Sequence, residues 1–383
     1  MPKIKTALGL MSGTSIDGID IALIKSDGNK VNERGVGKYY PYSQKIQNLL
    51  SKLINNKISS LLEIKQIELE ITKKHIDAVL DFLATKKIDS KEIDIVGFHG
   101  QTILHNPEQK ITWQIGNAQM LASTINIDVV ADFRTKDIVC GGQGAPLVPI
   151  YHLALFQNYN KPLVVLNIGG VTNITYIENS QPENLIAFDV CFGNAPINDF
   201  VKRKIGKNFD KDGILATKGE VNKYLAQAIL EISYFKQKPP KSLDRNQFNE
   251  IINQFPYLKI EDVLASLVYV IARSISGSMK FFPKQPEEII VCGGGRKNLA
   301  VINNIRNIVG IKTNNIDDIT IDGNDKIDGD FIEAEAFGFL AIRNLLNLPI
   351  SYPKTTGILL EKCVPQAFGY QQFSSCGGVF YRA

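Results

Sequence analysis

The chain has 383 residues, of which 44% are hydrophobic and 21% are charged, and its formal net charge at pH 7 is +4. This length allows two domains of ordinary size, and the composition is that of a globular protein. The basic side chains are scattered among acidic and apolar neighbours, so we predict no nucleic-acid partner. The sequence has no run of about 20 apolar residues and no signal-peptide pattern, which predicts a cytoplasmic protein with no membrane partner.

The cysteines give no sign of a structural metal. No two of them form a C-x-x-C pair, so we expect free thiols and no zinc site. They are Cys140, Cys191, Cys292, Cys363 and Cys376.

Two glycine-rich hairpins are the clearest predicted elements. Residues 6–25 form an apolar strand, a polar turn over 11–18 and a second strand, and residues 163–177 repeat this pattern around a turn over 167–173. A strand, a short glycine-containing turn and another strand are typical of a β-hairpin. The repeat predicts two domains of common design, 1–158 and 159–383, and leaves open whether the last helix and the tail pack back on the first domain.

Strands and helices alternate after each hairpin. Apolar runs predict buried strands at 92–98 and 288–292, and apolar residues at helical spacing predict a helix over 63–83. A later helix is predicted over 334–346, with Asp330 and Glu333 as its capping box. Alternation in both halves predicts an α/β fold with mixed central sheets.

Three glycine-rich turns that follow strands are candidate phosphate sites. Glycine backbone N–H groups can surround phosphate oxygens without an intervening side chain, and neighbouring hydroxyl groups can add hydrogen bonds. The Walker pattern and the Rossmann G-x-G-x-x-G pattern are absent, so the turns predict a nucleotide clamp of another kind. The candidate cofactor-binding residues are Gly13, Thr14, Ser15, Asp17, Gly18, Asp20, Gly169, Gly170, Asn173, Gly293, Gly294 and Gly295.

Three aspartates accompany the two hairpins. Asp17 and Asp20 are candidates to hold Mg²⁺ through water, because Mg²⁺ keeps several waters in phosphoryl-transfer sites. Asp189 ends the apolar run 185–188, and catalytic groups lie at strand ends in α/β sheets. An aspartate there can also be a turn former or a helix cap, but its place after the second hairpin favours a catalytic role.

Polar loop residues between the hairpins are candidates for binding a carbohydrate. They follow predicted strands, and an arginine among them can pair with a carboxylate through two hydrogen bonds. The candidate substrate-binding residues are His99, Gln101, Thr102, Gln114, Gly116 and Arg134. His99 can also be a satisfied loop histidine, and His75, His105 and His152 are expected to be structural.

Taken together, these motifs resemble the anhydro-N-acetylmuramic acid kinases, which belong to the superfamily of actin-like ATPases, sugar kinases and heat-shock ATPases. The resemblance extends over about residues 8–345. Its strongest matches are 10–20, 98–102, 132–134 with 141–149, 167–173, 292–295 and 330–337.

The resemblance implies a two-domain actin-like (ribonuclease H-like) fold with an interdomain active-site cleft, and a homodimer. It also implies a reaction that uses ATP and Mg²⁺. Water opens the 1,6-anhydro ring of the sugar while the γ-phosphoryl group is transferred to O6, giving N-acetylmuramic acid 6-phosphate and ADP. In this reaction Asp189 would be the base that deprotonates the water, and Arg134 would bind the lactyl carboxylate.

The chain departs from the family pattern next to Asp189. Val190-Cys191-Phe192 stands where the family usually has Thr-Gly-Pro, and residues 241–245 keep only part of the family's Lys-Ser-Thr-Gly-Arg. Two other interpretations therefore stay open: a kinase for a different amino sugar, and a non-catalytic sugar or nucleotide sensor on the same fold. A filament-forming relative of actin has no supporting sequence feature.

Overall fold

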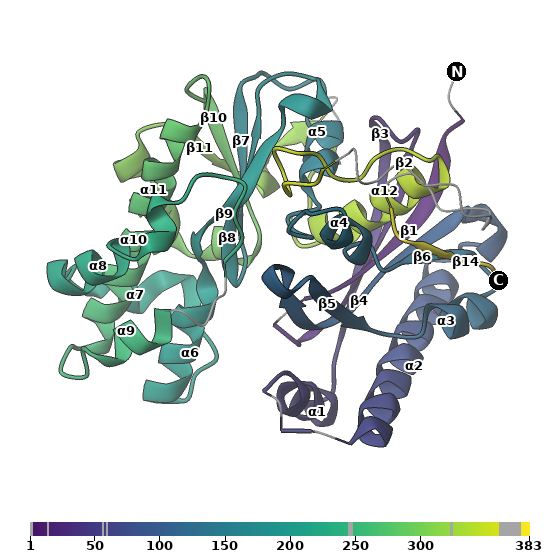
Figure 1. Cartoon of the computed structure of the whole chain (residues 1–383), viewed down its shortest axis with the longest axis horizontal. Helices are drawn as coiled ribbons and strands as arrows, with labels where there is room; N and C mark the ends of the chain where they lie inside the picture. Colours follow the sequence, from purple (N-terminus) through teal and green to yellow (C-terminus); the bar gives the residue numbers. More distant parts are fainter. Residues whose placement is uncertain are drawn as a thin grey trace. The chain divides into compact units, whose positions relative to one another are not determined.

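The structure is a computed structural model that describes residues 3–13, 15–55, 57–58, 60–243, 248–321, 325–359 and 377–383. It forms two compact units, shown in Figure 1. Unit 1 consists of Met1–Gln157 and Phe331–Ala383, and unit 2 is the continuous segment Asn158–Asp330. Residues 331–383, for which the sequence left the domain open, group with unit 1.

Within the described residues, unit 1 contains a seven-stranded sheet with the order β14-β6-β4-β1-β2-β3, and β5 pairs with β4. β2 is antiparallel to both β1 and β3, whereas β4 is parallel to β1 and β6 is parallel to β4. The strands are β1 (Lys5–Ser12), β2 (Gly18–Ser26), β3 (Val31–Pro41), β4 (Ile95–Asn106), β5 (Ile111–Ile115), β6 (Val129–Ala131) and β14 (Val379–Tyr381).

The five-stranded sheet of unit 2 repeats this arrangement. Its order is β11-β10-β7-β8-β9, with an antiparallel meander over β7, β8 and β9, and with β10 parallel to both β7 and β11. The strands are β7 (Leu163–Ile168), β8 (Val171–Ile177), β9 (Ile186–Phe192), β10 (Glu288–Cys292) and β11 (Lys312–Asn315), with a separate pair β12 (Thr320–Ile321) and β13 (Asp325–Lys326). Both predicted hairpins are therefore confirmed, and so is the predicted actin-like α/β fold with mixed sheets.

Helices cover the sheets of both units. The predicted helix over 63–83 is confirmed as α2, which begins after Ser60, whose hydroxyl accepts a hydrogen bond from Glu63 N. The helices of unit 1 are α1 (Gln44–Ile54), α2 (Leu61–Lys86), α3 (Ala118–Ile125), α4 (Thr135–Val139), α5 (Pro149–Leu155) and α12 (Ile332–Leu345). The helices of unit 2 are α6 (Asn194–Ile205), α7 (Ile214–Lys218), α8 (Lys223–Leu230), α9 (Asn249–Asn253), α10 (Ile260–Ser278) and α11 (Leu299–Val309).

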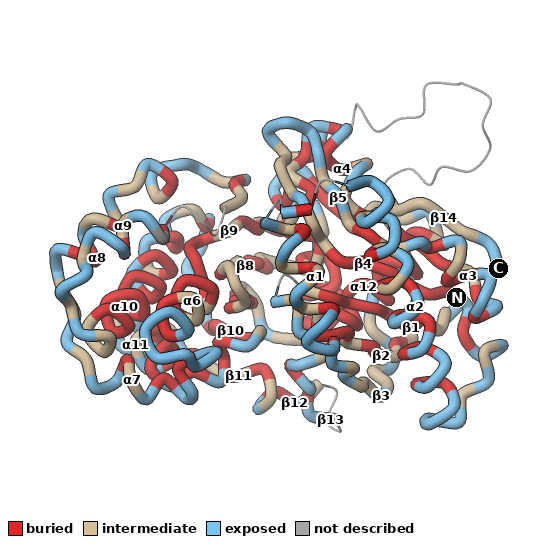
Figure 2. The backbone as a smooth tube through the Cα atoms, turned by 90° about the horizontal axis from the view of Figure 1, so that it is seen from below, coloured by how far each residue is buried: buried red, intermediate tan, exposed pale blue. Residues whose placement is uncertain are grey.

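α10 is the central helix of unit 2 and contacts α7, α8, α11 and β9. Figure 2 shows it buried along most of its length. The described segment Ile260–Phe281 is long and apolar enough to cross a membrane, although the sequence predicted no such segment. In the structure, 72% of its most apolar window is buried inside unit 2. A core helix of a globular domain accounts for this composition.

α12 completes unit 1 by packing on β1, β2 and β4. A side chain at Gly9 would overlap the Ala334 carbonyl, and one at Gly97 would overlap the Phe337 carbonyl, so both glycines let the helix backbone lie directly on the strands. The predicted capping box at the start of α12 is wrong. No side chain caps this helix, because the Asp330 carboxylate pairs with Arg296 and Lys297 instead.

A buried ion pair joins α12 to β3. Arg34 donates two hydrogen bonds to Glu335, from Nε to Oε2 at 2.9 Å and from Nη2 to Oε1 at 2.7 Å, and the Tyr151 hydroxyl of α5 donates to the same carboxylate. Glu335 is 1% exposed. Removing one partner of a buried pair leaves the other charge uncompensated, so this contact is expected to matter for stability.

We predict that Glu335→Ala destabilises unit 1 by about 3–5 kcal/mol, because Arg34 would remain buried without its counter-ion. Urea unfolding followed by circular dichroism measures this change. Glu70→Ala is the matched control, since its ion pair with Lys45 is exposed and is expected to contribute at most about 1 kcal/mol. Equal losses of stability in the two variants would contradict the prediction.

Candidate active site

The first glycine-rich turn connects β1 to β2 in unit 1. The Ser15 hydroxyl donates to Asp17 Oδ1 at 2.6 Å, and the Gln101 side chain donates from Nε2 to the Gly13 carbonyl at 3.0 Å. The space beside Gly13 is open, whereas a side chain at Gly18 would overlap the ring of Tyr39. Gly13 is therefore the glycine of this turn that leaves room for a ligand. Thr14 lies outside the described residues.

Asp17 and Asp20 lie close enough to Tyr39 for both carboxylates to act on its phenol. Burial and the two negative charges raise the pKa of Tyr39 to about 12. The Tyr39 hydroxyl donates to the Asp17 carbonyl at 2.9 Å, which fixes the backbone at the start of β2. The structure thus places the carboxylates of Asp17 and Asp20 near the same tyrosine side chain.

The second and third turns belong to unit 2. The turn at Gly169 and Gly170 is held by backbone hydrogen bonds, in which Gly193 N donates to the Gly170 carbonyl at 2.9 Å and Asn194 N donates to the Gly169 carbonyl at 2.8 Å. A side chain at Gly169 or Gly294 would meet nothing closer than 3.6 Å, but one at Gly293 or Gly295 would overlap β7 residues. Gly169 and Gly294 therefore leave space for a ligand, and the other two permit close packing.

A row of polar side chains crosses the unit 2 sheet near these turns. Asn167 of β7 is paired with Asn173 of β8, which is paired with Asp189 of β9. Directly paired residues point to the same face of a sheet. The structure therefore places the candidate base at the end of a polar row that includes the predicted Asn173.

Asp189 is the central residue of β9, so the prediction that it lies at a strand end is wrong: the strand continues through Phe192 because Val190, Cys191 and Phe192 are themselves apolar. Three hydrogen bonds hold Asp189 at this edge of the sheet. Its backbone N–H donates to the Lys241 carbonyl at 3.0 Å, and its carbonyl accepts from the Tyr234 hydroxyl at 2.6 Å. Its carboxylate oxygen Oδ2 accepts from Leu243 N at 2.9 Å. The segment with Lys241 and Leu243 thus lies against the edge of β9 and orients the carboxylate. The sequence singled out residues 241–245 as part of a family motif but did not link them to Asp189, and it gave no sign of Tyr234, because these contacts join residues more than 40 positions apart.

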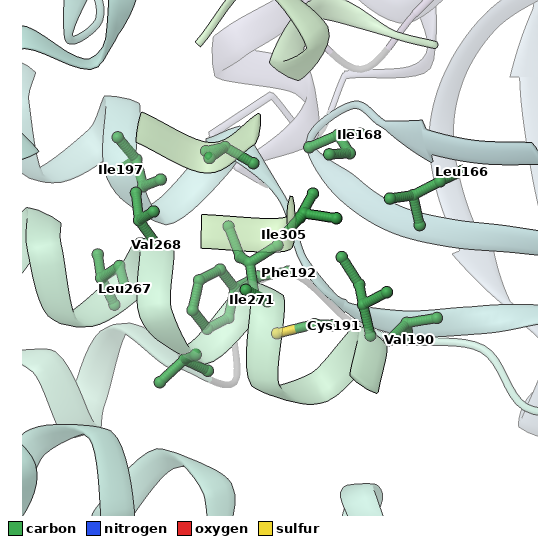
Figure 3. Packing of buried hydrophobic residues seen from close by; sticks show 14 of the residues in the cluster. Leu166, Ile168, Val190, Cys191, Phe192, Ile197, Leu267, Val268, Ile271 and Ile305 are labelled. Atoms are coloured by element: carbon green, nitrogen blue, oxygen red, sulfur yellow. The ribbon is translucent and has the colours of Figure 1, made fainter. Parts of the chain in front are cut away.

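The unusual residues after Asp189 point into the hydrophobic core. Val190, Cys191 and Phe192 are at most 3% exposed and pack with residues of β7, α6, α10 and α11, as Figure 3 shows. Burial raises the pKa of the Cys191 thiol to about 12, so it is a neutral core group at neutral pH. The replacement of the usual family residues is thus accommodated by packing.

His99 and Arg134 form a connected pair in unit 1. Arg134 donates to His99 Nε2 from Nη2 at 2.9 Å and from Nε at 3.2 Å, and from Nη1 to the Gly144 carbonyl at 2.7 Å. His99 Nδ1 lies 2.8 Å from the Gly100 carbonyl, so the proton of the neutral ring is on Nδ1. Burial and the Arg134 charge hold the pKa of His99 well below its usual range.

A cavity of about 200 Å³ in unit 1 contains part of the predicted sugar site. His99, Gln114 and Gly116 line it, together with aromatic rings such as Trp113 and Tyr381. Aromatic surfaces and a few polar groups in a concave site suit a small ligand. Sequence analysis missed Trp113 and Tyr381, and Tyr381 is brought there only because β14 pairs with β6.

The other predicted sugar-binding residues do not line this cavity. Gln101 is completely buried and its side chain supports the first turn at Gly13. Thr102 lies behind Gln114, whose Nε2 is 3.4 Å from the Thr102 hydroxyl. Arg134 does not line the cavity, but it contacts the lining residue His99. The structure therefore separates residues that face the cavity from residues that hold them.

Arg296 also holds part of the candidate site in place, and the sequence did not predict this role. Its side chain is 2% exposed and pairs with Asp317 and Asp330, each at 2.9 Å, while Nη1 donates to the Gly293 carbonyl at 3.2 Å. These contacts tie the third glycine turn to the segment after β11. The arginine directly follows the glycine run, but its carboxylate partners are distant in sequence.

The sequence profile of the anhydro-N-acetylmuramic acid kinases matches residues 5–368. The chain belongs to this family. Relatives named anhydro-N-acetylmuramic acid kinase from Zymomonas mobilis and Bradyrhizobium diazoefficiens are 42% and 43% identical to it, and each alignment covers 92% of this chain and 96% of the relative. Among solved structures, component A of the Acidaminococcus fermentans (R)-2-hydroxyglutaryl-CoA dehydratase is similar, with a TM-score of 0.48, 11% identity, and coverage of 89% of this chain and 99% of that one. The strand order that both sheets share, and not this structural similarity, identifies the fold.

Membership of an anhydro-N-acetylmuramic acid kinase family implies that the chain uses ATP and a sugar. Kinases of this kind work with Mg²⁺, and the carboxylates of Asp17 and Asp20 are the donors that this ion prefers. Among the residues that the structure describes, no three acidic, histidine or cysteine side chains form a metal cage. The donor set thus fits an ion held largely by water and phosphate oxygens.

Because Arg296 holds the third glycine turn, we predict that Arg296→Ala weakens binding of a non-hydrolysable ATP analogue about tenfold, the equivalent of one lost hydrogen bond to a phosphate. Isothermal titration calorimetry measures this affinity. Lys297→Ala is the matched control, since Lys297 is exposed and has in common with Arg296 only the ion pair to Asp330. An unchanged affinity in Arg296→Ala would show that the turn does not need this support.

Proposed function

We propose that the chain is an ATP-dependent anhydro-N-acetylmuramic acid kinase. Water opens the 1,6-anhydro ring of the sugar and the γ-phosphoryl group of ATP passes to O6, giving N-acetylmuramic acid 6-phosphate and ADP. The observation that best supports this assignment is the position of Asp189. Its carboxylate is fixed by Leu243 N at the end of a polar row, beside the glycine turn at Gly169, in a chain that belongs to this kinase family.

In the proposed mechanism Asp189 accepts a proton from the attacking water. The water oxygen forms a bond to the anomeric carbon as the bond from that carbon to O6 breaks. O6 leaves with the electron pair and attacks the γ-phosphorus, and ADP departs. One carboxylate can support this sequence, because the alkoxide that forms on O6 is itself the phosphoryl acceptor.

The other residues would position the substrates. We propose that the open backbone at Gly13, Gly169 and Gly294 approaches the phosphates, where preorganised N–H groups stabilise the charge that develops during transfer. Asp17 and Asp20 would hold Mg²⁺ through water, and the ion would neutralise phosphate charge. The remaining predicted residues of the three turns would shape this site.

We propose that the cavity of unit 1 binds the sugar. His99 and Gln114 would supply hydrogen bonds, Gly116 would leave room for the ring, and Trp113 would offer an aromatic face. Gln101 would act by holding the first glycine turn at Gly13, and Thr102 by holding the cavity residue Gln114. Arg134 is proposed to bind the lactyl carboxylate from beside His99, since the residue is partly exposed and its guanidinium contacts the cavity residue His99.

The two other interpretations have less support. A different amino sugar was suggested by the replaced residues after Asp189, but Cys191 and Phe192 are core residues, and Val190 belongs to the same core and lines only a cavity of unit 2 that does not include Asp189. A non-catalytic sensor would have no need of a carboxylate held by a backbone N–H beside a phosphate turn. The cytoplasmic location, the homodimer and the absence of nucleic-acid and membrane partners stay predictions.

We predict that Asp189→Asn lowers kcat for phosphorylation of 1,6-anhydro-N-acetylmuramic acid by about 10²–10⁴-fold, because an amide cannot accept the proton of the water. A coupled assay of ADP release with Mg-ATP measures the rate, and analysis of the product identifies the 6-phosphate. Asp212→Asn makes the same substitution at an exposed position of unit 2 and is the control. A variant at Asp189 that retained more than a tenth of the activity would exclude it as the base.

We predict that Arg134→Ala raises KM for the natural sugar at least about tenfold more than KM for 1,6-anhydro-N-acetylglucosamine, which lacks the lactyl group. The difference arises because only the natural sugar carries a carboxylate for the guanidinium. Equal changes for both sugars would instead assign Arg134 to orienting His99.

A further inference from the structure

A second cavity, of about 180 Å³, lies within unit 2 and contains none of the residues proposed for the ATP or sugar sites. One of its walls is apolar and includes Phe188, Leu230, Phe235 and Phe281. Phe188 directly precedes Asp189 in β9, so the two side chains point to opposite faces of the strand. The cavity is therefore on the other side of β9 from the candidate base.

Three cationic side chains line the same cavity: Lys241, Arg273 and Lys280. Within the described parts of the chain, none of them has an acidic side chain at ion-pair distance. Arg273 and Lys280 are exposed, whereas Lys241 is only 7% exposed. A buried ammonium group beside two other cations, without a carboxylate partner, is costly unless an anion joins it.

The position of Lys241 is fixed by its surroundings. Its Nζ donates to the Tyr234 carbonyl at 3.0 Å and lies 4.2 Å from the centre of the Tyr234 ring. Burial and the neighbouring Lys280 charge lower the pKa of Lys241 to about 8, while Cys191 and Asp189 act weakly in the opposite direction. At pH 7 the amine therefore carries most of its charge, and a bound anion would stabilise that charge.

A buried hydroxyl supplies a second polar feature of the wall. Ser274 of α10 is 8% exposed and lines the cavity, and its hydroxyl is close enough to the Cys191 thiol to counteract the rise in the pKa of that thiol. A hydroxyl group can make more than one hydrogen bond, so Ser274 also offers a neutral polar group to a ligand in the cavity. It adds to the cationic side chains, which carry the argument for an anion.

We propose that this cavity binds a small organic anion that carries at least two negative charges and an aromatic or other apolar group. The charged end would face Lys241, Arg273 and Lys280, and the apolar end would pack on Phe188, Leu230, Phe235 and Phe281. The site is separate from the sites proposed for ATP and sugar, and its occupancy does not depend on the proposed reaction.

Phenyl phosphate is a suitable probe, because it joins a dianion to a single aromatic ring. Isothermal titration calorimetry is done on the full chain at pH 7 with a saturating non-hydrolysable ATP analogue and saturating 1,6-anhydro-N-acetylmuramic acid, so that those sites are filled. We expect saturable binding of one equivalent, and weaker binding of both phenol and inorganic phosphate. Absence of saturable binding, or equally tight binding of inorganic phosphate, would overturn the proposal.

Charge reversal at the rim locates the site. We expect Arg273→Glu and Lys280→Glu each to weaken phenyl phosphate binding about tenfold or more. Both side chains are exposed, so the fold should persist, and unchanged affinity for the ATP analogue verifies this. Lys211→Glu reverses an exposed charge elsewhere in unit 2 and is the matched control. Affinity unaffected at Arg273 and Lys280, or equally reduced in the control, would place the probe elsewhere.

Discussion

The direct packing of α12 on β1 and β4 is the constraint on which unit 1 depends. Gly9 and Gly97 are required there because the helix carbonyl groups occupy the space of a side chain. The same helix carries Glu335, whose carboxylate is paired with Arg34 and hydrogen-bonded by Tyr151. One helix therefore joins β1, β2, β3 and β4 to α5. One of these strands, β4, also contributes to the wall of the unit 1 cavity, through Phe98, His99 and Gly100.

Unit 2 uses a different device to hold the candidate base. Asp189 is in the edge strand β9, where a side chain would be poorly fixed if nothing lay beside it. Lys241 and Leu243 each make a hydrogen bond to Asp189 at this edge, and the Tyr234 hydroxyl donates to the Asp189 carbonyl. The carboxylate is oriented by backbone groups, while Val190, Cys191 and Phe192 fill the core. Side chains beside Asp189 can thus vary without moving the carboxylate.

Local patterns in the sequence predicted the elements that depend on local chemistry. The two hairpins, β10 and α2 follow from glycine-rich turns and apolar periodicity. The candidate base was predicted at a strand end, but it lies in the middle of β9, because the apolar residues after it extend the strand. The contacts of Asp330 could not be predicted, because a capping box and an ion pair with Arg296 use the same carboxylate, and the choice depends on distant residues. The membership of α12 in unit 1, and the presence of Tyr381 in the cavity, likewise depend on pairing across the whole chain.

The order in which the chain is made has a consequence for unit 1. Unit 2 occupies Asn158–Asp330 without interruption, so the ribosome produces all of it before it reaches α12. At about 5–20 residues per second, β4 would wait roughly 12–48 seconds and β1 roughly 17–67 seconds for the helix that covers them. During this interval their apolar faces are open to solvent or to chaperones. Unit 2 can therefore mature during synthesis, whereas unit 1 must wait for a segment that is made after the whole of unit 2.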